Sequence, residues 1–342
     1  MKKSFRSKLP ALILLLLLIL SAAIYILFFT TLPEKLGWRE DKNVVASCVG
    51  YDMTLDEVRY VTLLYRAEFE ARYGEDVWKD PEKTEAHRSE LEETVTRELK
   101  NNYAVLATAK DHLSKEEIED KSLGATVDAQ IDELKAYYGD SFAEILKGQN
   151  LTESFLRFTL WVDALQTRLY EKLDSNQEIV GFADTASFYD WLRDGNCVYL
   201  QYVYLSNDPG EDPKENLALA ERIREELLAG KDIAEYLGSA VNDDLSNVAP
   251  RFFVRELCED DLWQTLKELM LPGQVSRVVQ TEKGFYVFVA MEEPSGLLEG
   301  QADDLFSDFK TSRKSRLVES YRERIVIDWN ERGKAIDFVT LN

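Results

Sequence analysis

An uninterrupted apolar run near the N-terminus constrains this 342-residue chain more than any other feature. Residues Ala11–Phe29 are all Leu, Ile, Ala or Phe except Ser21 and Tyr25, and they follow a basic, acid-free segment at residues 1–8. A helix needs about 20 apolar residues to cross a bilayer, and positive charge stays on the cytoplasmic side. The pattern predicts one transmembrane helix with a cytoplasmic N-terminus. A cleaved signal peptide is the alternative, although no small-x-small cleavage site precedes Glu34.

The charge balance describes the part of the chain that follows this anchor. The formal net charge is −22, and residues 1–8 carry +4, which leaves −26 for the remainder. Such a surface repels nucleic-acid phosphates and anionic lipid headgroups, so we expect no nucleic-acid partner. It keeps the chain soluble, and it also favours basic or unfolded polypeptides as partners.

The cysteines and histidines form no pattern of a metal site or a nucleophilic enzyme. Cys48, Cys197 and Cys258 are far apart and include no CxxC, so a zinc or thioredoxin-like motif is not supported. We expect these thiols to be buried, with at least one unpaired. His87 and His112 both lie in a helical pattern, which leaves no plausible Ser-His-Asp set. No glycine-rich phosphate loop occurs, and we expect neither a cofactor nor a metal.

Helical periodicity dominates residues 42–174. The segment opens with a β-branched strand at residues 44–49 and a turn at Gly50. Thr54 and Glu57 have the spacing of a capping box, which predicts a helix start. Further helices are expected at residues 85–113, 125–138, 141–147 and 152–173.

The pattern changes after residues 175–196, which are polar and without periodicity and which we interpret as a linker. Residues 197–294 read as a small α+β domain, because short alternating strands and amphipathic helices follow one another. The acids at residues 259–261 could bind calcium, but a solvated helix start is the better interpretation. Strands are expected at residues 197–205, 251–257, 275–281 and 285–292, and helices at 214–237 and 260–269.

The C-terminal segment, residues 300–342, predicts a long amphipathic helix at 305–329 and a closing strand at 334–342. The helix cannot bury its apolar stripe alone, and we expect the helical N-terminal part to cover it. The closing strand can pair with residues 44–49.

Two sequence stretches carry a resemblance to a known family. The entry VASCVGYDMTLDEV and the helix pair FAEILKGQNLTESFLRFTLWVDALQTRLYEKL resemble the chaperone module of the SurA, PpiD and PrsA-type extracytoplasmic foldases. The stretch LKELMLPGQVSRVVQTEKGFYVFVAMEE resembles the end of a parvulin (rotamase) domain. The residues that carry the parvulin match are Leu269, Pro272, Gly273, Val275, Ser276, Val279, Thr281 and Gly284.

The resemblance implies a fold. It is an α+β protein with a cytoplasmic tip and transmembrane helix in residues 1–33 and a mostly helical SurA-N-like chaperone module at 42–174. A parvulin-like α+β domain at 197–294 is inserted, and a helix and strand at 300–342 return to complete the chaperone module. We expect a single-pass protein of the cell membrane with its bulk outside the cytoplasm.

The resemblance also implies which positions form the site. Parvulins carry one histidine in the first strand and another in the last, and this chain has Tyr202 and Tyr286 there. Asp244 matches the aspartate version of a third polar position. The positions of the pocket that holds a proline ring in this family are occupied here by Phe253, Cys258 and Leu262.

The function implied is that of a membrane-anchored chaperone that binds unfolded exported polypeptides. The two tyrosines can replace the hydrogen bonds of the histidines, or they can be core aromatics; either way we expect weak or absent isomerase activity. An active peptidyl-prolyl cis-trans isomerase is the first alternative. A non-catalytic adaptor of a membrane complex is the second.

Overall fold

The computed structural model describes residues 43–207, 212–237, 241–244, 247, 249–281 and 283–341. The predicted transmembrane segment Ala11–Phe29 lies outside them. Within the described residues, no helix is both long and apolar enough to span a membrane. The described residues divide into two compact units, one drawn from residues 43–103, 130–159 and 325–341 and the other from residues 104–129 and 160–324.

The first part of the chain is mostly helical, as the periodicity predicts. The capping box of Thr54 and Glu57 is present at the start of its first helix. The elements up to residue 173 are β1 (Val44–Cys48), β2 (Tyr51–Thr54), α3 (Leu55–Tyr73), α4 (Pro81–His112), α5 (Lys115–Ile118), α6 (Lys121–Tyr138), η1 (Gly139–Ser141), α7 (Phe142–Gly148) and α8 (Glu153–Leu173).

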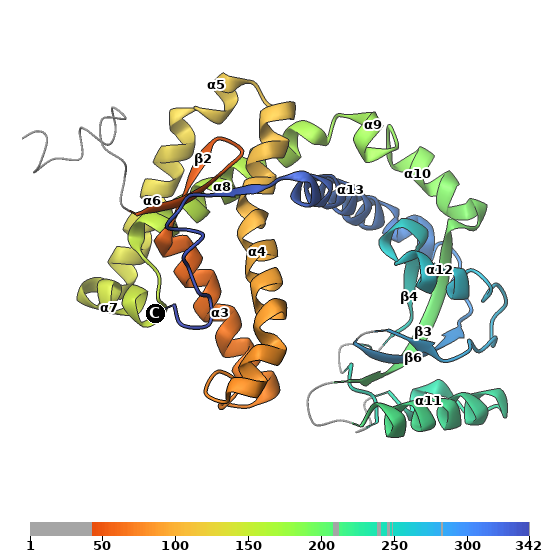
Figure 1. Cartoon of the computed structure of the whole chain (residues 1–342). Helices are drawn as coiled ribbons and strands as arrows, with labels where there is room; N and C mark the ends of the chain where they lie inside the picture. The colour runs from red at the N-terminus through yellow and green to blue at the C-terminus, as the bar shows by residue number, and fades with distance from the viewer. Residues whose placement is uncertain are drawn as a thin grey trace, which may run out of the picture. The chain divides into compact units, whose positions relative to one another are not determined.

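A three-stranded sheet, in the order β2-β1-β7, joins the two ends of the described chain in the first unit. The strand β7 (Ile327–Trp329) pairs antiparallel with β1. The expected strand at 334–342 is wrong, and the partner of β1 comes instead from the end of the predicted helix 305–329, because α13 stops at Arg324. The Asn330 side chain accepts hydrogen bonds from the backbone N–H groups of Arg332 and Gly333, which turns the chain. The last residues then follow α3 (Figure 1), where Arg66 donates to the Leu341 carbonyl at 2.7 Å.

The second unit contains a four-stranded antiparallel sheet in the order β4-β3-β6-β5, which confirms the α+β character of this region. Its elements are α9 (Gln177–Val180), α10 (Thr185–Trp191), η2 (Leu192–Asn196), β3 (Cys197–Ser206), α11 (Pro213–Leu228), η3 (Ile233–Glu235), β4 (Arg251–Val254), η4 (Arg255–Leu257), α12 (Asp260–Leu266), β5 (Val279–Gln280), β6 (Gly284–Ala290) and α13 (Leu297–Arg324).

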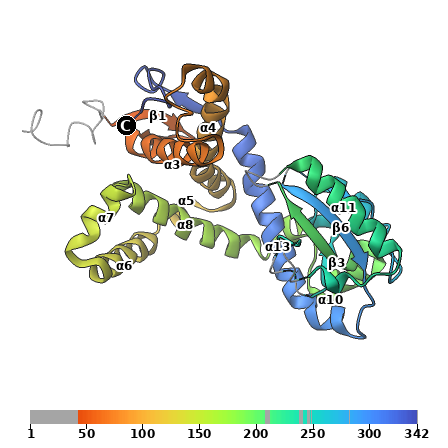
Figure 2. The ribbon, with the colours of Figure 1, turned by 90° about the horizontal axis from the view of Figure 1, so that it is seen from below.

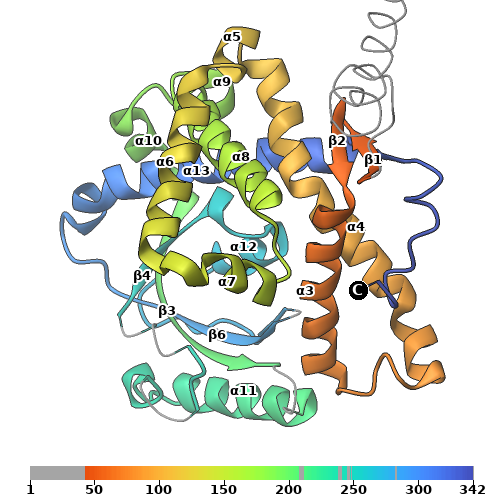
Figure 3. The same cartoon turned by 90° about the vertical axis from the view of Figure 1, so that its left-hand side faces the viewer.

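Helices cover both faces of this sheet, α11 on one and α12 on the other (Figure 3). Because side chains alternate along a strand, each strand supplies both cores. Tyr202 of β3 and Phe288 of β6 pack with Trp263 of α12. Val203 of β3 and Phe285 of β6 point to the opposite face of the sheet and pack with α11. The site described below lies on the α12 face.

Several expected elements in this region are too long. The helix predicted at 214–237 ends at Leu228, because Gly230 adopts a φ of +96° that breaks it. The strand expected at 275–281 keeps regular pairing only at β5, together with one bridge from Val275 to Val289. The predicted strand at 251–257 gives way to the helical turn η4 after Val254.

The segment expected to be a linker is folded. Residues 177–196 form α9, α10 and η2, and Phe188 of α10 is fully buried. The Phe188 ring lies 5.1 Å from the rings of both Phe306 and Phe309 of α13. The two helices α10 and α13 lie beside each other in Figure 2. Helix α13 therefore begins at Leu297 and not at the predicted residue 305, because its first turns bury apolar side chains against α10.

The second half of α13 contacts the helical part of the chain, as expected. The buried Lys314 ammonium lies 2.5 Å from the Asp174 carboxylate, just past α8. The Tyr321 hydroxyl donates to Asp111 of α4 at 2.5 Å. Helix α13 thus packs against α10 in its first half and against the helical part of the chain in its second half, whereas the sequence predicted only the helical part as its partner.

The β3–β6 pairing depends on a glycine. Gly284 has a φ of +155°, and a Cβ built on it would lie 2.1 Å from the Leu205 carbonyl oxygen. We predict that Gly284→Ala destabilises the protein by about 2 kcal/mol or more through this overlap. Gly300→Ala in α13 meets no atom within 4 Å and should stabilise by about 0.5–1 kcal/mol. Urea unfolding followed by circular dichroism measures both, and equal effects would contradict the prediction.

Candidate functional site

Tyr202 lies at the centre of the α12 face and is only 2% exposed. It sits opposite Phe288 in the β3–β6 register, so its ring is fixed by the sheet. Its hydroxyl donates to Asp244 Oδ2 at 2.5 Å and accepts from Arg251 Nη2 at 2.6 Å. The structure therefore brings together two of the three predicted polar residues.

Arg251 is the partner that sequence reasoning missed. It begins β4, and its guanidinium carbon lies 4.9 Å from the centroid of the Tyr202 ring and 5.2 Å from that of Phe253. The signal available was spacing: Arg251 and Phe253 are two residues apart on a strand and so share a face. The cation stacks on two aromatic rings while it donates to the tyrosine hydroxyl, which fixes all three groups.

Asparagine side chains hold the Asp244 segment against β3. The Asn242 amide oxygen accepts from the Tyr204 backbone N–H at 3.0 Å, and its Nδ2 donates to the Asp244 carbonyl at 2.9 Å. Asn247 is buried and donates to the Tyr202 carbonyl. The carboxylate thus reaches Tyr202 from a segment that is tied to the same strand.

Burial raises the pKa of the Tyr202 hydroxyl, and the hydrogen bond to Asp244 raises it further. The hydroxyl keeps its proton, which it donates to Asp244, and its lone pair is used by Arg251. Because the hydroxyl already donates one hydrogen bond and accepts another within the protein, it is poorly placed to hydrogen-bond a ligand.

Tyr286 has a different environment, although its ring shares the same face. Its ring centroid lies 4.6 Å from that of Tyr204, 5.7 Å from that of Phe288 and 5.7 Å from that of Tyr202. It is half-buried, and burial raises its pKa. Its hydroxyl makes no hydrogen bond to the described residues. Unlike Tyr202, this tyrosine faces a cavity.

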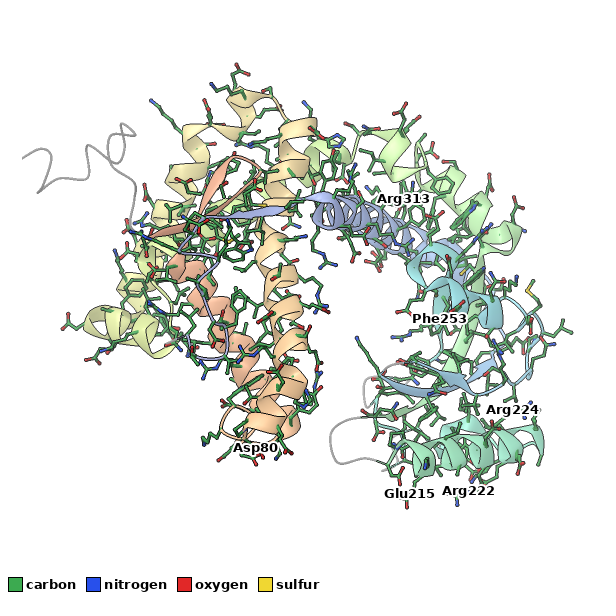
Figure 4. All side chains as sticks on the ribbon, in the orientation of Figure 1. Asp80, Glu215, Arg222, Arg224, Phe253 and Arg313 are labelled. Atoms are coloured by element: carbon green, nitrogen blue, oxygen red, sulfur yellow. The ribbon has the colours of Figure 1, made fainter. Side chains whose placement is uncertain are left out.

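The cavity has a volume of about 1020 Å³ and lies between β4, α12 and the β5–β6 turn. Phe253, Cys258, Leu262 and Tyr286 line it together, which places all three predicted pocket residues beside one of the predicted tyrosines. Figure 4 shows Phe253 on the α12 side of the sheet, with Arg222 and Arg224 of α11 on the other. The rest of the described lining is Leu257, Glu259, Asp261, Thr265, Arg277, Val278, Val279, Gln280, Thr281 and Lys283.

Tyr202 and Asp244 are not among the described residues that line this cavity. They lie behind Tyr286 and Phe253, whose rings are 5.7 Å and 6.0 Å from the ring of Tyr202. The predicted polar set is therefore divided. Tyr286 lines the cavity, whereas Tyr202 and Asp244 bond to each other next to the residues that line it.

The cysteines are unpaired, and Cys258 serves as part of the apolar wall. Burial raises the pKa of its thiol to about 11, so it stays neutral. Burial also raises the pKa of Cys48 to about 11 and that of Cys197 to about 12. Neutral buried thiols are poor nucleophiles. Among the residues that the structure describes, no group of three or more His, Cys, Asp or Glu side chains could hold a metal ion.

The two tyrosines should respond differently to loss of the hydroxyl. We predict that Tyr202→Phe costs about 1.5–3 kcal/mol of unfolding free energy, because a buried hydroxyl bonded to two charged groups is removed. Tyr286→Phe is the matched control and should stay within about 0.5 kcal/mol of the parent. Urea unfolding compares them. Equal costs would show that the Tyr202 network contributes nothing beyond packing.

No protein-family model and no curated protein matches this chain. Solved structures that match include the peptidylprolyl isomerase PrsA from Bacillus anthracis, at 15% identity and a TM-score of 0.38, over 65% of this chain and 94% of that one. The foldase PrsA from Streptococcus pneumoniae matches at 16% identity and a TM-score of 0.33, over 82% of this chain and 91% of that one. A SurA-like chaperone from Campylobacter jejuni matches at 14% identity and a TM-score of 0.22, over 85% of this chain and 100% of that one.

Proposed function

We propose that this chain is a membrane-anchored extracytoplasmic chaperone that holds extended segments of unfolded exported polypeptides. The observation that carries the proposal is the cavity beside Tyr286. Its volume of about 1020 Å³ is at the upper end of ordinary ligand pockets and exceeds what one proline ring needs. About half of its lining is apolar or aromatic, with Phe253, Leu262 and Tyr286 among these residues. Such a surface binds apolar side chains by removing them from water.

The arrangement of polar groups favours binding over catalysis. Rotation about a prolyl bond must disrupt the amide conjugation, and the barrier is about 18–20 kcal/mol. An enzyme lowers such a barrier with polar groups directed at the twisted amide. In this site Arg251, Asp244 and Tyr202 satisfy one another behind the wall. They are positioning residues for the cavity, and we expect isomerisation to be weak or absent.

An active isomerase is the second candidate, and one feature favours it. Tyr286 lines the cavity, and its hydroxyl has no hydrogen bond to the described residues. Because its pKa is raised, the hydroxyl keeps its proton and can donate to a bound carbonyl. A single donor is a small part of the network that such catalysis uses.

A charge placed in the apolar part of the cavity wall should weaken client binding. We predict that Leu262→Glu weakens binding by on the order of 1–3 kcal/mol, because a carboxylate in an apolar wall disrupts seating of an apolar side chain. Leu228→Glu is the matched control, since Leu228 is 56% exposed on α11 and lies outside the cavity. The measurement is suppression of aggregation of a denatured client at equimolar full-length protein. If the parent suppresses nothing, or if both variants lose suppression equally, the proposal is wrong.

A protease-coupled prolyl isomerase assay separates the two candidates. We expect the parent to leave the uncatalysed rate unchanged. A clear acceleration that Tyr286→Phe removes would instead establish the chain as an enzyme with Tyr286 as a catalytic residue. The aggregation assay is independent of this outcome.

The anchor is a further part of the proposal, supported by the apolar run Ala11–Phe29 and its basic flank. We predict that the full chain stays with membranes after alkaline carbonate extraction, and that removal of residues 1–33 releases it. External protease should digest the remainder in spheroplasts. Release of the full chain by carbonate would contradict a transmembrane anchor.

A further inference from the structure

The wall of the cavity carries charges of both signs. Glu259 and Asp261 line it at the start of α12, while Arg277 and Lys283 line it beside β5 and the β5–β6 turn. Both carboxylates and the Lys283 ammonium are exposed and form no ion pair with the described residues. Arg277 is fixed, because its Nε and Nη2 lie 3.3 and 3.0 Å from Thr265 Oγ1. A ligand in the cavity, beside the start of α12, therefore meets two carboxylates that no described cation pairs with.

The cavity also borders a free strand edge. Residues 278–281 line it, and β5 is the last strand in the order β4-β3-β6-β5. One side of β5 pairs with β6, and no described strand pairs with the other side. An unpaired strand edge offers backbone N–H and C=O groups to an extended chain. The cavity thus combines a backbone template with an apolar wall, which suits a peptide better than a compact small molecule.

We infer that this cavity selects extended peptide segments in which a lysine or arginine flanks the apolar residue held between Phe253 and Leu262. Glu259 and Asp261 are the specificity-determining residues, and they receive the cation at the α12 end. The inference rests on the proposed function and adds the chemical class of its client segments. Charge complementarity of this kind sets selectivity and association rate more than total affinity.

The neighbouring Asp260 provides the control that isolates this role. Acids in the first turn of α12 stabilise the helix through its dipole, and Glu259, Asp260 and Asp261 share that effect. Asp260 does not line the cavity. Asp260→Asn therefore removes one charge from the same turn without changing the cavity, whereas Glu259→Gln with Asp261→Asn removes the charges that face it.

The test is fluorescence anisotropy of three labelled peptides with the full chain in detergent micelles. The peptides are identical except for Lys, Gln or Glu beside one central apolar residue. We expect the Lys peptide to bind roughly 3- to 10-fold more tightly than the Gln peptide, as two exposed, screened carboxylates support. The Glu peptide should bind least tightly, and 0.5 M salt should reduce the differences.

The variants decide the assignment. The Glu259→Gln, Asp261→Asn double variant should lose the preference for Lys and retain binding of the Gln peptide, while Asp260→Asn should keep the parental preference. Equal loss in both variants, or no loss in the double variant, overturns the inference. If the parent binds the three peptides equally and still suppresses client aggregation, the inference fails and the proposed function stands. Failure of peptide binding and of aggregation suppression together overturns both.

Discussion

The antiparallel pairing of β3 with β6 places the residues of the site, and the rest of the second unit is arranged around it. The register runs from Leu200 opposite Ala290 to Ser206 opposite Gly284. A slip of one residue would exchange the two faces, so that Tyr286 would point toward α11 and Phe285 toward the cavity. Gly284 allows the strands to approach at the end of this register, where any side chain would collide with Leu205. The cavity is thus a consequence of strand pairing as much as of the residues that line it.

The polar residues at the centre of the site satisfy one another within the protein. Arg251, Tyr202 and Asp244 form a connected set in which a cation, a hydroxyl and a carboxylate each have a partner. Around the buried Tyr202 hydroxyl such a set is stabilising only when complete, since one missing member leaves a polar group without its partner. Such a set gives the wall a fixed shape. It also withdraws from the ligand the groups that would be needed to act on a bound amide.

Local patterns made much of the fold predictable, and long-range packing accounts for what they missed. The capping box at Thr54 and the alternation in β3 and β6 depend on neighbouring residues, and both were recognised. The helix α10 was missed because its seven residues carry little periodicity of their own, and Phe188 becomes a core residue only against α13. The positions of the predicted pocket residues followed from the resemblance. The different environments of Tyr202 and Tyr286 could not be predicted from the sequence, because both are aromatic residues at similar positions in strands with the same alternating pattern. Only the folded structure shows that Tyr286 lines the cavity and Tyr202 does not.

The sheet of the first unit has a consequence for how the chain is made. The Asn330 side chain donates to the Val44 carbonyl across 286 residues, beside the β1–β7 pairing. The chain is synthesised from its N-terminus, so β1 cannot pair with β7 until nearly all of the chain has followed. The four-stranded sheet, whose strands lie within residues 197–290, can complete its pairing in that interval. The first unit then closes last, over a loop whose large entropic cost is reduced if the intervening segment is already compact. A molecule proposed to hold unfinished chains would itself pass through a long unfinished stage.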